Sequence, residues 1–192
     1  MVSKGSENDD EALAKKIYLD HGGSSFFMSR SGIYEEYRAL NFDRRKEKEW
    51  ARERIVELLA MPIDPGMLIG GSFGGLIELI KNSDDREGLE ILIEKIEALE
   101  DEWDTMSLLL IAESMLRLLH TAKHDRILYD RRLIEREKRI VARLLARASE
   151  MKITVAPIYR EDRYMKDFLS DQHVLERIEN DRREFEGYSD NQ

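Results

Sequence analysis

The sequence predicts an all-α fold, an irregular helical bundle, from three observations. Charged residues make up 37% of the 192 residues and hydrophobic residues 42%, which suits amphipathic helices with charged outer faces. Proline occurs only three times, and the helix-favouring residues Leu, Glu, Arg and Ala are abundant. Apolar residues also recur at helical spacing between residues 43 and 186.

A short degenerate α-solenoid is the alternative architecture. The expected helices at 85–100 and 105–121 are joined tightly, as in a solenoid hairpin. No second copy of this pair occurs at the roughly 34- to 47-residue periods of such repeats. The bundle is therefore the expected fold.

The N-terminal part of the chain carries the weakest helical signal. Residues 1–11 are polar, acidic and without periodicity, so we expect a disordered tail before a single helical domain, 12–192. Residues 12–19 suit a short helix or a strand, and the glycines after them indicate a loop. We expect the apolar patch 26–28 to fill a place in the core, and a short helix to follow around Tyr37.

The next two helices have recognisable ends. Asp43 is expected to cap a helix that ends near Met61 at a proline-rich stop. The apolar face of this helix is expected to consist of Trp50, Ala51, Ile55, Leu58 and Leu59. The second half of the glycine-rich stretch 67–80 is expected to be helical, and Asp84 with Glu87 has capping-box spacing for the next helix.

The C-terminal half is expected to hold the main bundle. The helix at 105–121 is apolar almost all round and is expected to be central, between the helix at 85–100 and a long one at 124–150. A last helix is expected at 171–186. A single short extended segment is expected near 152–156. The residues expected to point inward from the first and last of these helices are Leu89, Leu92, Ile96, Leu99, Val174, Leu175, Ile178 and Phe185.

Composition also bounds the compartment and the partner. The formal net charge of −9 disfavours nucleic acid and anionic membranes unless the positive charges are clustered. The chain has no Cys, which fits a reducing compartment and leaves no thiolate for metal binding or catalysis. The most apolar stretch, 106–119, contains two charged residues and is too short to span a bilayer. We therefore expect a soluble, cytoplasmic protein with no membrane contact.

The sharpest formal motif is the pentapeptide from Gly70 to Gly74, which satisfies G-x-S-x-G around Ser72. In hydrolases this motif exposes a serine nucleophile at a strand-to-helix turn within a parallel sheet. The chain lacks the alternation of strands and helices that builds such a sheet. A serine hydrolase at Ser72 is therefore an alternative to the expected function, and no catalytic residue is assigned.

Two histidines four residues apart suggest a metal site. His120 and His124 would share one helix face, with Glu113 roughly on the same side. A structural zinc site needs four ligands and a catalytic one needs three, so this set is incomplete. We expect neither a metal nor a cofactor.

The most informative feature is a line of arginines in the long helix. Arg132, Arg136, Arg139, Arg143 and Arg147 follow spacings of four, three, four and four, which places them in one stripe. A matching acidic stripe comes from Glu90, Glu94, Glu97 and Asp101. Because each stripe lies away from its own helix's apolar residues, the two are not expected to meet fully within one chain. Arginine offers a planar fork suited to carboxylate and phosphate.

The sequence thus favours a non-enzymatic protein-interaction module, whether an adaptor, an inhibitor of the immunity-protein type or an oligomer-forming protein. Its expected partner is an acidic protein surface or a second copy of the chain, bound through the arginine stripe. A nucleic-acid binder using the same stripe is the other alternative, against which stands the absence of interleaved aromatic residues. The unusual glycine-rich segment 18–27 carries no assigned role.

Overall fold

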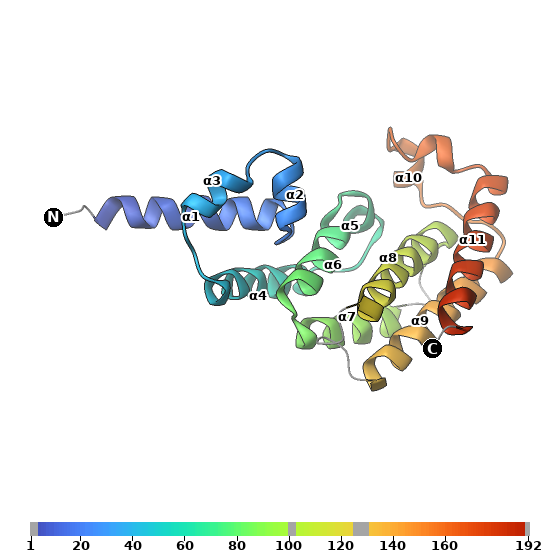
Figure 1. The fold of residues 1–192 in the computed structure, drawn as a ribbon. Helices are drawn as coiled ribbons and strands as arrows, with labels where there is room; N and C mark the ends of the chain where they lie inside the picture. The colour runs from blue at the N-terminus through green and yellow to red at the C-terminus, as the bar shows by residue number, and fades with distance from the viewer. Residues whose placement is uncertain (1–3, 100–102, 125–130, 191–192) are drawn as a thin grey trace. The chain divides into compact units, whose positions relative to one another are not determined.

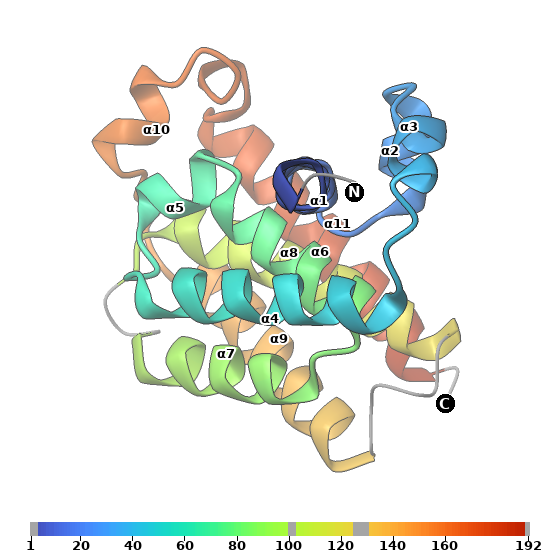
Figure 2. The ribbon, with the colours of Figure 1, turned by 90° about the vertical axis from the view of Figure 1, so that its left-hand side faces the viewer.

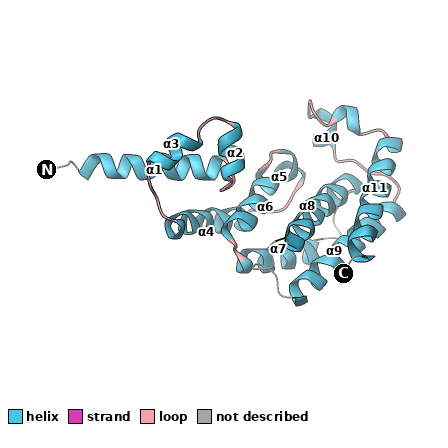
Figure 3. Cartoon of the chain, viewed as in Figure 1, coloured by secondary structure: helices cyan, strands magenta, loops and turns pink. Residues whose placement is uncertain are grey.

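The structure is a computed structural model that describes residues 4–99, 103–124 and 131–190. In these ranges it contains eleven α-helices and one 3-10 turn, without any strand (Figure 3). The expected all-α class, a helical bundle, is confirmed. The order of the elements along the chain can be followed in Figure 1.

Contacts between Cα atoms divide the chain into two compact units. Unit 1 comprises Met1–Met61 and Gly75–Gly88, and unit 2 comprises Pro62–Gly74 and Leu89–Gln192. The range expected to form one domain, 12–192, therefore contributes to both units.

Unit 1 is built on α1 (Lys4–Asp20) and α4 (Arg44–Ala60), which pack against each other. Glu11 of α1 and Lys46 of α4 form an ion pair of 2.8 Å. The helix already begins at Lys4, so residues 4–11, where a disordered tail is expected, continue α1, and 1–3 lie outside the described residues. Once α1 is anchored on α4, each added residue gains one helical hydrogen bond without a new nucleation step.

The expected helix after Asp43 is present with its cap and its buried face. The Asp43 carboxylate accepts a hydrogen bond of 2.9 Å from the backbone N–H of Lys46. Trp50, Ala51, Ile55, Leu58 and Leu59 are all buried. The helix ends at Ala60, ahead of Pro62, because a residue before proline is disfavoured in helical conformation.

Two short helices, α2 (Ser25–Arg30) and α3 (Tyr34–Ala39), lie side by side in unit 1 (Figures 1 and 2). The expectation that the patch 26–28 fills a place in the core is wrong for two of its three residues. Met28 is 2% exposed, but Phe26 is 66% and Phe27 41% exposed. Successive residues of a helix point about 100° apart, so three neighbours on a six-residue helix cannot all face the core.

Three helices follow α4: α5 (Pro65–Ile69), α6 (Ser72–Ser83) and α7 (Arg86–Leu99). The cap before α7 lies one residue later than expected. Asp84 adopts a positive φ of 59°, and the Asp85 carboxylate accepts the 2.9 Å hydrogen bond from the N–H of Gly88. Of the expected inward residues, Leu89, Leu92 and Ile96 are fully buried, and the side chain of Leu99 lies outside the described residues.

Unit 2 is a bundle of α8 (Thr105–His124), α9 (Arg131–Glu150) and α11 (Asp171–Asp190). Each of these three helices packs against the other two. In a solenoid each repeat contacts only its neighbours, so the mutual packing of α8 and α11 fits the bundle and not the solenoid alternative. The expected start of the long helix, at 124–130, lies beyond the described range of α9.

The remaining chain of unit 2 contains α10 (Pro157–Glu161) and the 3-10 turn η2 (Lys166–Phe168). The expected extended segment, 152–156, is free of helix but pairs with no strand in the described structure. Instead Thr154 exchanges hydrogen bonds with Thr105 at the start of α8. Tyr159 is fully buried, and its hydroxyl lies 2.8 Å from that of Ser107.

None of the helices in the described ranges is long and apolar enough to cross a membrane.

Candidate functional site

The five arginines of the predicted stripe all lie on α9. Arg132, Arg139 and Arg143 are exposed, whereas Arg136 and Arg147 are half-buried. The buried residues of the helix are Leu133, Glu137, Ile140, Val141, Leu144, Leu145 and Ala148. At about 100° per residue, the centre of the stripe lies roughly 120° around the helix from the centre of the buried face. The stripe thus lies on a flank of the helix, and its inner members face a neighbouring helix.

That neighbour is α7, which carries the acidic stripe. The guanidinium of Arg136 donates two hydrogen bonds to the Glu97 carboxylate, at 3.2 Å and 2.5 Å, and lies 3.8 Å from Glu94. The hydrogen bonds from Arg136 lower the pKa of Glu97, and the same bonds raise the pKa of Arg136. The two stripes, which were not expected to meet fully within one chain, therefore do meet at this pair.

The two stripes can meet because the acidic stripe, like the arginine stripe, lies on a flank of its helix. Glu90, Glu94 and Glu97 are centred roughly 120° from the buried face of α7, by the same helical geometry. Two flanking stripes can face one another across a groove between helices, which two opposite stripes cannot. Asp101, the fourth member of the acidic stripe, lies outside the described residues.

Three members of the arginine stripe are exposed to solvent. Arg132 and Arg139 are exposed and make no hydrogen bond or ion pair with any described residue. Arg143 is exposed between them and the half-buried Arg147. Helix α9 carries six arginines and one lysine against three glutamates, although the whole chain has a net charge of −9. It is a locally basic surface on an acidic protein.

The G-x-S-x-G motif has a different geometry from a nucleophile elbow. The N–H of Gly70 closes α5 by bonding the carbonyl of Gly66 at 2.9 Å, Gly71 adopts a positive φ of 77°, and α6 begins at Ser72. The turn connects two helices, whereas the elbow connects a strand to a helix. In the described part of the chain, the Ser72 hydroxyl makes no hydrogen bond to a histidine.

We therefore expect Ser72→Ala to leave the protein's function unchanged, with a loss of stability of at most about 1 kcal/mol from altered helix capping. Treatment of the wild-type protein with a fluorophosphonate probe is expected to give no labelling. Labelling of the wild type that disappears in Ser72→Ala would restore the hydrolase alternative.

The histidine pair does not gather a metal site. Nε2 of His120 lies 3.0 Å from Oε1 of Glu184, and its ring packs edge-on against Tyr188. Glu113 is occupied by Arg177, whose guanidinium donates to it at 2.6 Å and 3.0 Å. The side chain of His124 lies outside the described residues, and the described ones contain no group of three metal-ligating side chains.

A buried acidic residue on α9 has no counterpart in the sequence interpretation. Glu137 is fully buried, and neither carboxyl oxygen has a hydrogen-bond partner among the described residues. Burial therefore raises its pKa well above the ordinary value. The signal was present in the sequence: Glu137 stands at i+4 from Leu133 and i−4 from Val141, within the apolar stripe.

Asp181 of α11 is a second perturbed acid in unit 2. Burial raises its pKa to about 7, and the charge of Glu113 adds to that effect, while Arg177 opposes it. One of its carboxyl oxygens is buried and has no hydrogen-bond partner in the part of the chain that the structure describes. The bundle therefore contains two acids, Asp181 and Glu137, whose pKa values are raised above those of ordinary carboxyl groups.

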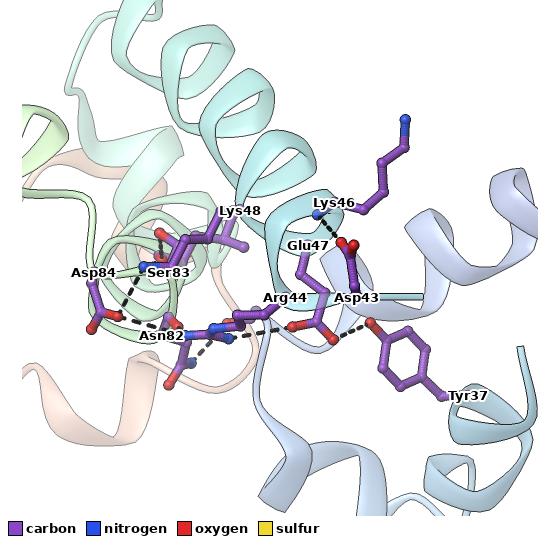
Figure 4. Close-up of polar contacts among 11 residues, drawn as sticks. Tyr37, Asp43, Arg44, Lys46, Glu47, Lys48, Asn82, Ser83 and Asp84 are labelled. Carbon is purple, nitrogen blue, oxygen red and sulfur yellow. Dashed lines mark hydrogen bonds and ion pairs between the residues drawn. The ribbon is translucent and has the colours of Figure 1, made fainter. Parts of the chain in front are cut away.

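Unit 1 contains a polar network that joins α3, α4 and the end of α6 (Figure 4). The Tyr37 hydroxyl donates to Glu47 at 2.6 Å, and Arg44 donates to the same carboxylate at 3.4 Å. Arg44 also donates to the backbone carbonyl of Asn82 and lies 3.8 Å from Asp84. Burial and the bond to Glu47 raise the pKa of Tyr37, so this hydroxyl stays protonated and acts as a donor.

The segment 18–27 anchors to this network. The side-chain amide of Asn82 donates to the carbonyl of Gly22 at 2.8 Å. In the same segment His21 bonds the carbonyl of Ile17 and the hydroxyl of Ser31, each at 2.8 Å. The glycine-rich turn is thus fixed by hydrogen bonds of the Asn82 and His21 side chains.

Comparison with protein-family models, curated proteins and solved structures finds no significant match to this chain.

Proposed function

We propose that the protein is a non-enzymatic interaction module whose basic helix α9 binds an acidic surface of another protein in the cytoplasm. The observation that carries the proposal is the pair of exposed arginines, Arg132 and Arg139, which make no hydrogen bond or ion pair with any described residue. Arg143 continues the same line. Arginine forks pair with carboxylates in bidentate geometry, and arginine is enriched at the energetic centres of interfaces.

A different protein is favoured over a second copy of the chain as the partner. Self-association through complementary stripes needs the acidic stripe to be available, but Glu97 is already engaged by Arg136 of the same chain. Releasing it would break an existing bidentate pair in order to form an equivalent one. Such an exchange supplies little net free energy to hold two copies together.

Nucleic acid remains the second candidate, because phosphate also suits the arginine fork. Helix α9 contains no aromatic residue on which bases could stack. The acidic charge of the chain as a whole also repels a polyanion at distances within the Debye length. A protein surface presents fewer negative charges than nucleic acid and is less affected by this repulsion.

The decisive variant reverses Arg132, Arg139 and Arg143 to Glu. Exposed charges contribute only ~0–1 kcal/mol each to folding, so the melting temperature is expected to stay close to that of the wild type. Truncating an arginine anchor at an interface costs about 2 kcal/mol or more, so association is expected to be abolished. Quantitative affinity purification followed by titration of the recovered partner measures this loss.

A matched control reverses three exposed arginines of unit 1, Arg30, Arg45 and Arg54, which changes the net charge by the same amount. The control is expected to retain the partner. Retention of every partner by the α9 variant would contradict the proposal. A wild-type protein that dimerises while the α9 variant is monomeric would assign the surface to self-association, and loss of a salt-dependent complex with duplex DNA would assign it to nucleic acid.

A further inference from the structure

Unit 1 contains a cavity that is separate from the arginine surface of α9. Its volume is about 370 Å³, within the range of sites for small organic ligands. Its walls come from the end of α1, the glycine-rich turn, α2, α3, the loop after α3 and the start of α4. The segment 18–27, which has no role in the proposed function, supplies part of this wall through Tyr18, Gly23 and Ser25.

The cavity has an aromatic lining. The rings of Tyr18, Tyr34, Tyr37 and Phe42 all contribute to it. Tyr18 and Tyr37 are stacked with ring centroids 6.3 Å apart, and both are buried, so these two rings form a fixed wall. Aromatic walls hold flat, conjugated molecules through offset stacking and edge contacts.

The charged groups that line the cavity favour an anion. They are two arginines, Arg38 and Arg44, and one carboxylate, Glu47. Glu47 already accepts hydrogen bonds from the Tyr37 hydroxyl and from Arg44, so its charge is largely neutralised. Among the described residues, Arg38 has only a 3.8 Å contact with Glu35 and a cation–π contact with Tyr34 at 5.8 Å. Its guanidinium therefore has unused donors.

Two neutral polar groups of the lining are also unused. The Ser25 hydroxyl and the Asn41 amide make no hydrogen bond within the described residues. Asn41 adopts a positive φ of 56° in the loop between α3 and α4, a left-handed conformation that asparagine accepts after the end of a helix.

We propose that this cavity binds a small planar aromatic molecule that carries one anionic group, a carboxylate or a phosphate. The ring lies among the tyrosines, and the anion is held by Arg38 with Arg44 beside it. Ser25 and Asn41 supply hydrogen bonds to the ligand. This site is independent of α9, so loss of one function leaves the other in place.

The test uses the full chain and a matched set of probes. Naphthoate and naphthyl phosphate carry the ring and the anion, naphthylmethanol the ring alone, naphthylmethylamine the ring and a cation, and inorganic phosphate the anion alone. Titration of backbone amide resonances by NMR is expected to give saturable shifts around α2, α3 and the start of α4. The better of the two anionic aromatics is expected to bind at least about tenfold more tightly than any other probe, and which of them it is identifies the anion.

Two variants and one control locate the site. Arg38→Gln is expected to weaken binding of the anionic aromatic about tenfold, which corresponds to the loss of one charge-assisted contact. Ser25→Trp, which places a bulky ring at the exposed first residue of α2, is expected to abolish binding. Arg30→Gln, on α2 but outside the cavity, is expected to bind as the wild type does. Circular dichroism verifies that all three remain folded.

Three results would overturn the proposal. One is the absence of saturable shifts at the cavity residues for both anionic aromatics up to millimolar concentration. Another is equal affinity for the neutral or cationic probe, which would remove the anion preference. The last is binding unchanged by both Arg38→Gln and Ser25→Trp in folded protein, which would place the ligand elsewhere.

Discussion

Replacing Glu137 with Met is expected to stabilise the protein by about 2–4 kcal/mol, because a buried group without a partner costs free energy on this scale. The side chain is fully buried on the core face of α9, and neither oxygen has a described partner. Methionine has a similar length and flexibility and fills the same space with apolar atoms. Equilibrium unfolding in urea, with the melting temperature as a second measure, tests the change.

The same residue makes stability depend on pH in a defined direction. Burial raises the pKa of Glu137 in the folded protein above its ordinary value of 4.5, so the folded state holds a proton that the unfolded state has released. The contribution of Glu137 to stability is therefore fully present below its ordinary pKa of 4.5 and is lost as the pH rises through the pKa of the folded state. Asp181, with a folded pKa of about 7, adds a decline in the same direction.

Two comparisons separate the contributions. Glu137→Met is expected to make the decline in stability with rising pH shallower, and Asp181→Asn is expected to remove the part between the ordinary pKa of 3.8 and the folded pKa of about 7. Glu135→Met changes an exposed acid on the same helix and is expected to shift stability by less than about 0.5 kcal/mol. A Glu137→Met protein less stable than the wild type at neutral pH would show that the carboxylate has a stabilising partner.

Helix α4 shows what local sequence signals can specify. Its cap at Asp43 and its five buried residues were all predictable, because a capping side chain and helical periodicity act within one helix. The cap of α7 fell one residue later, on Asp85 instead of Asp84. Two adjacent aspartates offer the same chemistry, and the left-handed conformation of Asp84 that decides between them depends on the path of the chain.

The candidate site shows where local signals end. The sequence located the five arginines correctly on one helix, but it did not predict the contact of Arg136 with Glu97. That contact depends on which flank of α9 faces α7, and this is decided by packing between segments about 40 residues apart. Glu137 was missed for a related reason, because an acid within an apolar stripe is normally expected to reach solvent.

The cavity of unit 1 could not be predicted from the sequence. Its lining comes from six successive segments whose residues share no spacing or motif. Of these segments, only the glycine-rich turn has an unusual sequence. Its composition indicates a loop but does not indicate that the loop lines a cavity. Packing of α3 against α1 and α2, and of α1 against α4, brings the tyrosines and arginines together.

The turn itself allows a sharp test of why it contains glycine. Gly23 adopts a positive φ of 71°, and a Cβ atom there would lie 2.7 Å from the Tyr18 hydroxyl oxygen and 2.9 Å from the ring carbon that bears it. Tyr18 is 1% exposed and packed against Trp50, so its ring has little room to move. Gly23→Ala is expected to destabilise unit 1 by roughly 2–4 kcal/mol, the sum of the left-handed backbone cost and a steric clash in a packed core.

Gly32→Ala is the matched control for this prediction. Gly32 has a similar φ of 78°, but a Cβ atom there would meet nothing within 4 Å. Gly32→Ala is expected to reduce stability only by the cost of the left-handed backbone conformation, about 1–2 kcal/mol. Urea unfolding followed by the fluorescence of Trp50, in a Trp103→Phe background that silences the second of the two tryptophans, reports on unit 1. Equal losses in the two variants would show that Tyr18 yields to the added methyl group, and that the turn requires glycine at position 23 for its backbone conformation alone.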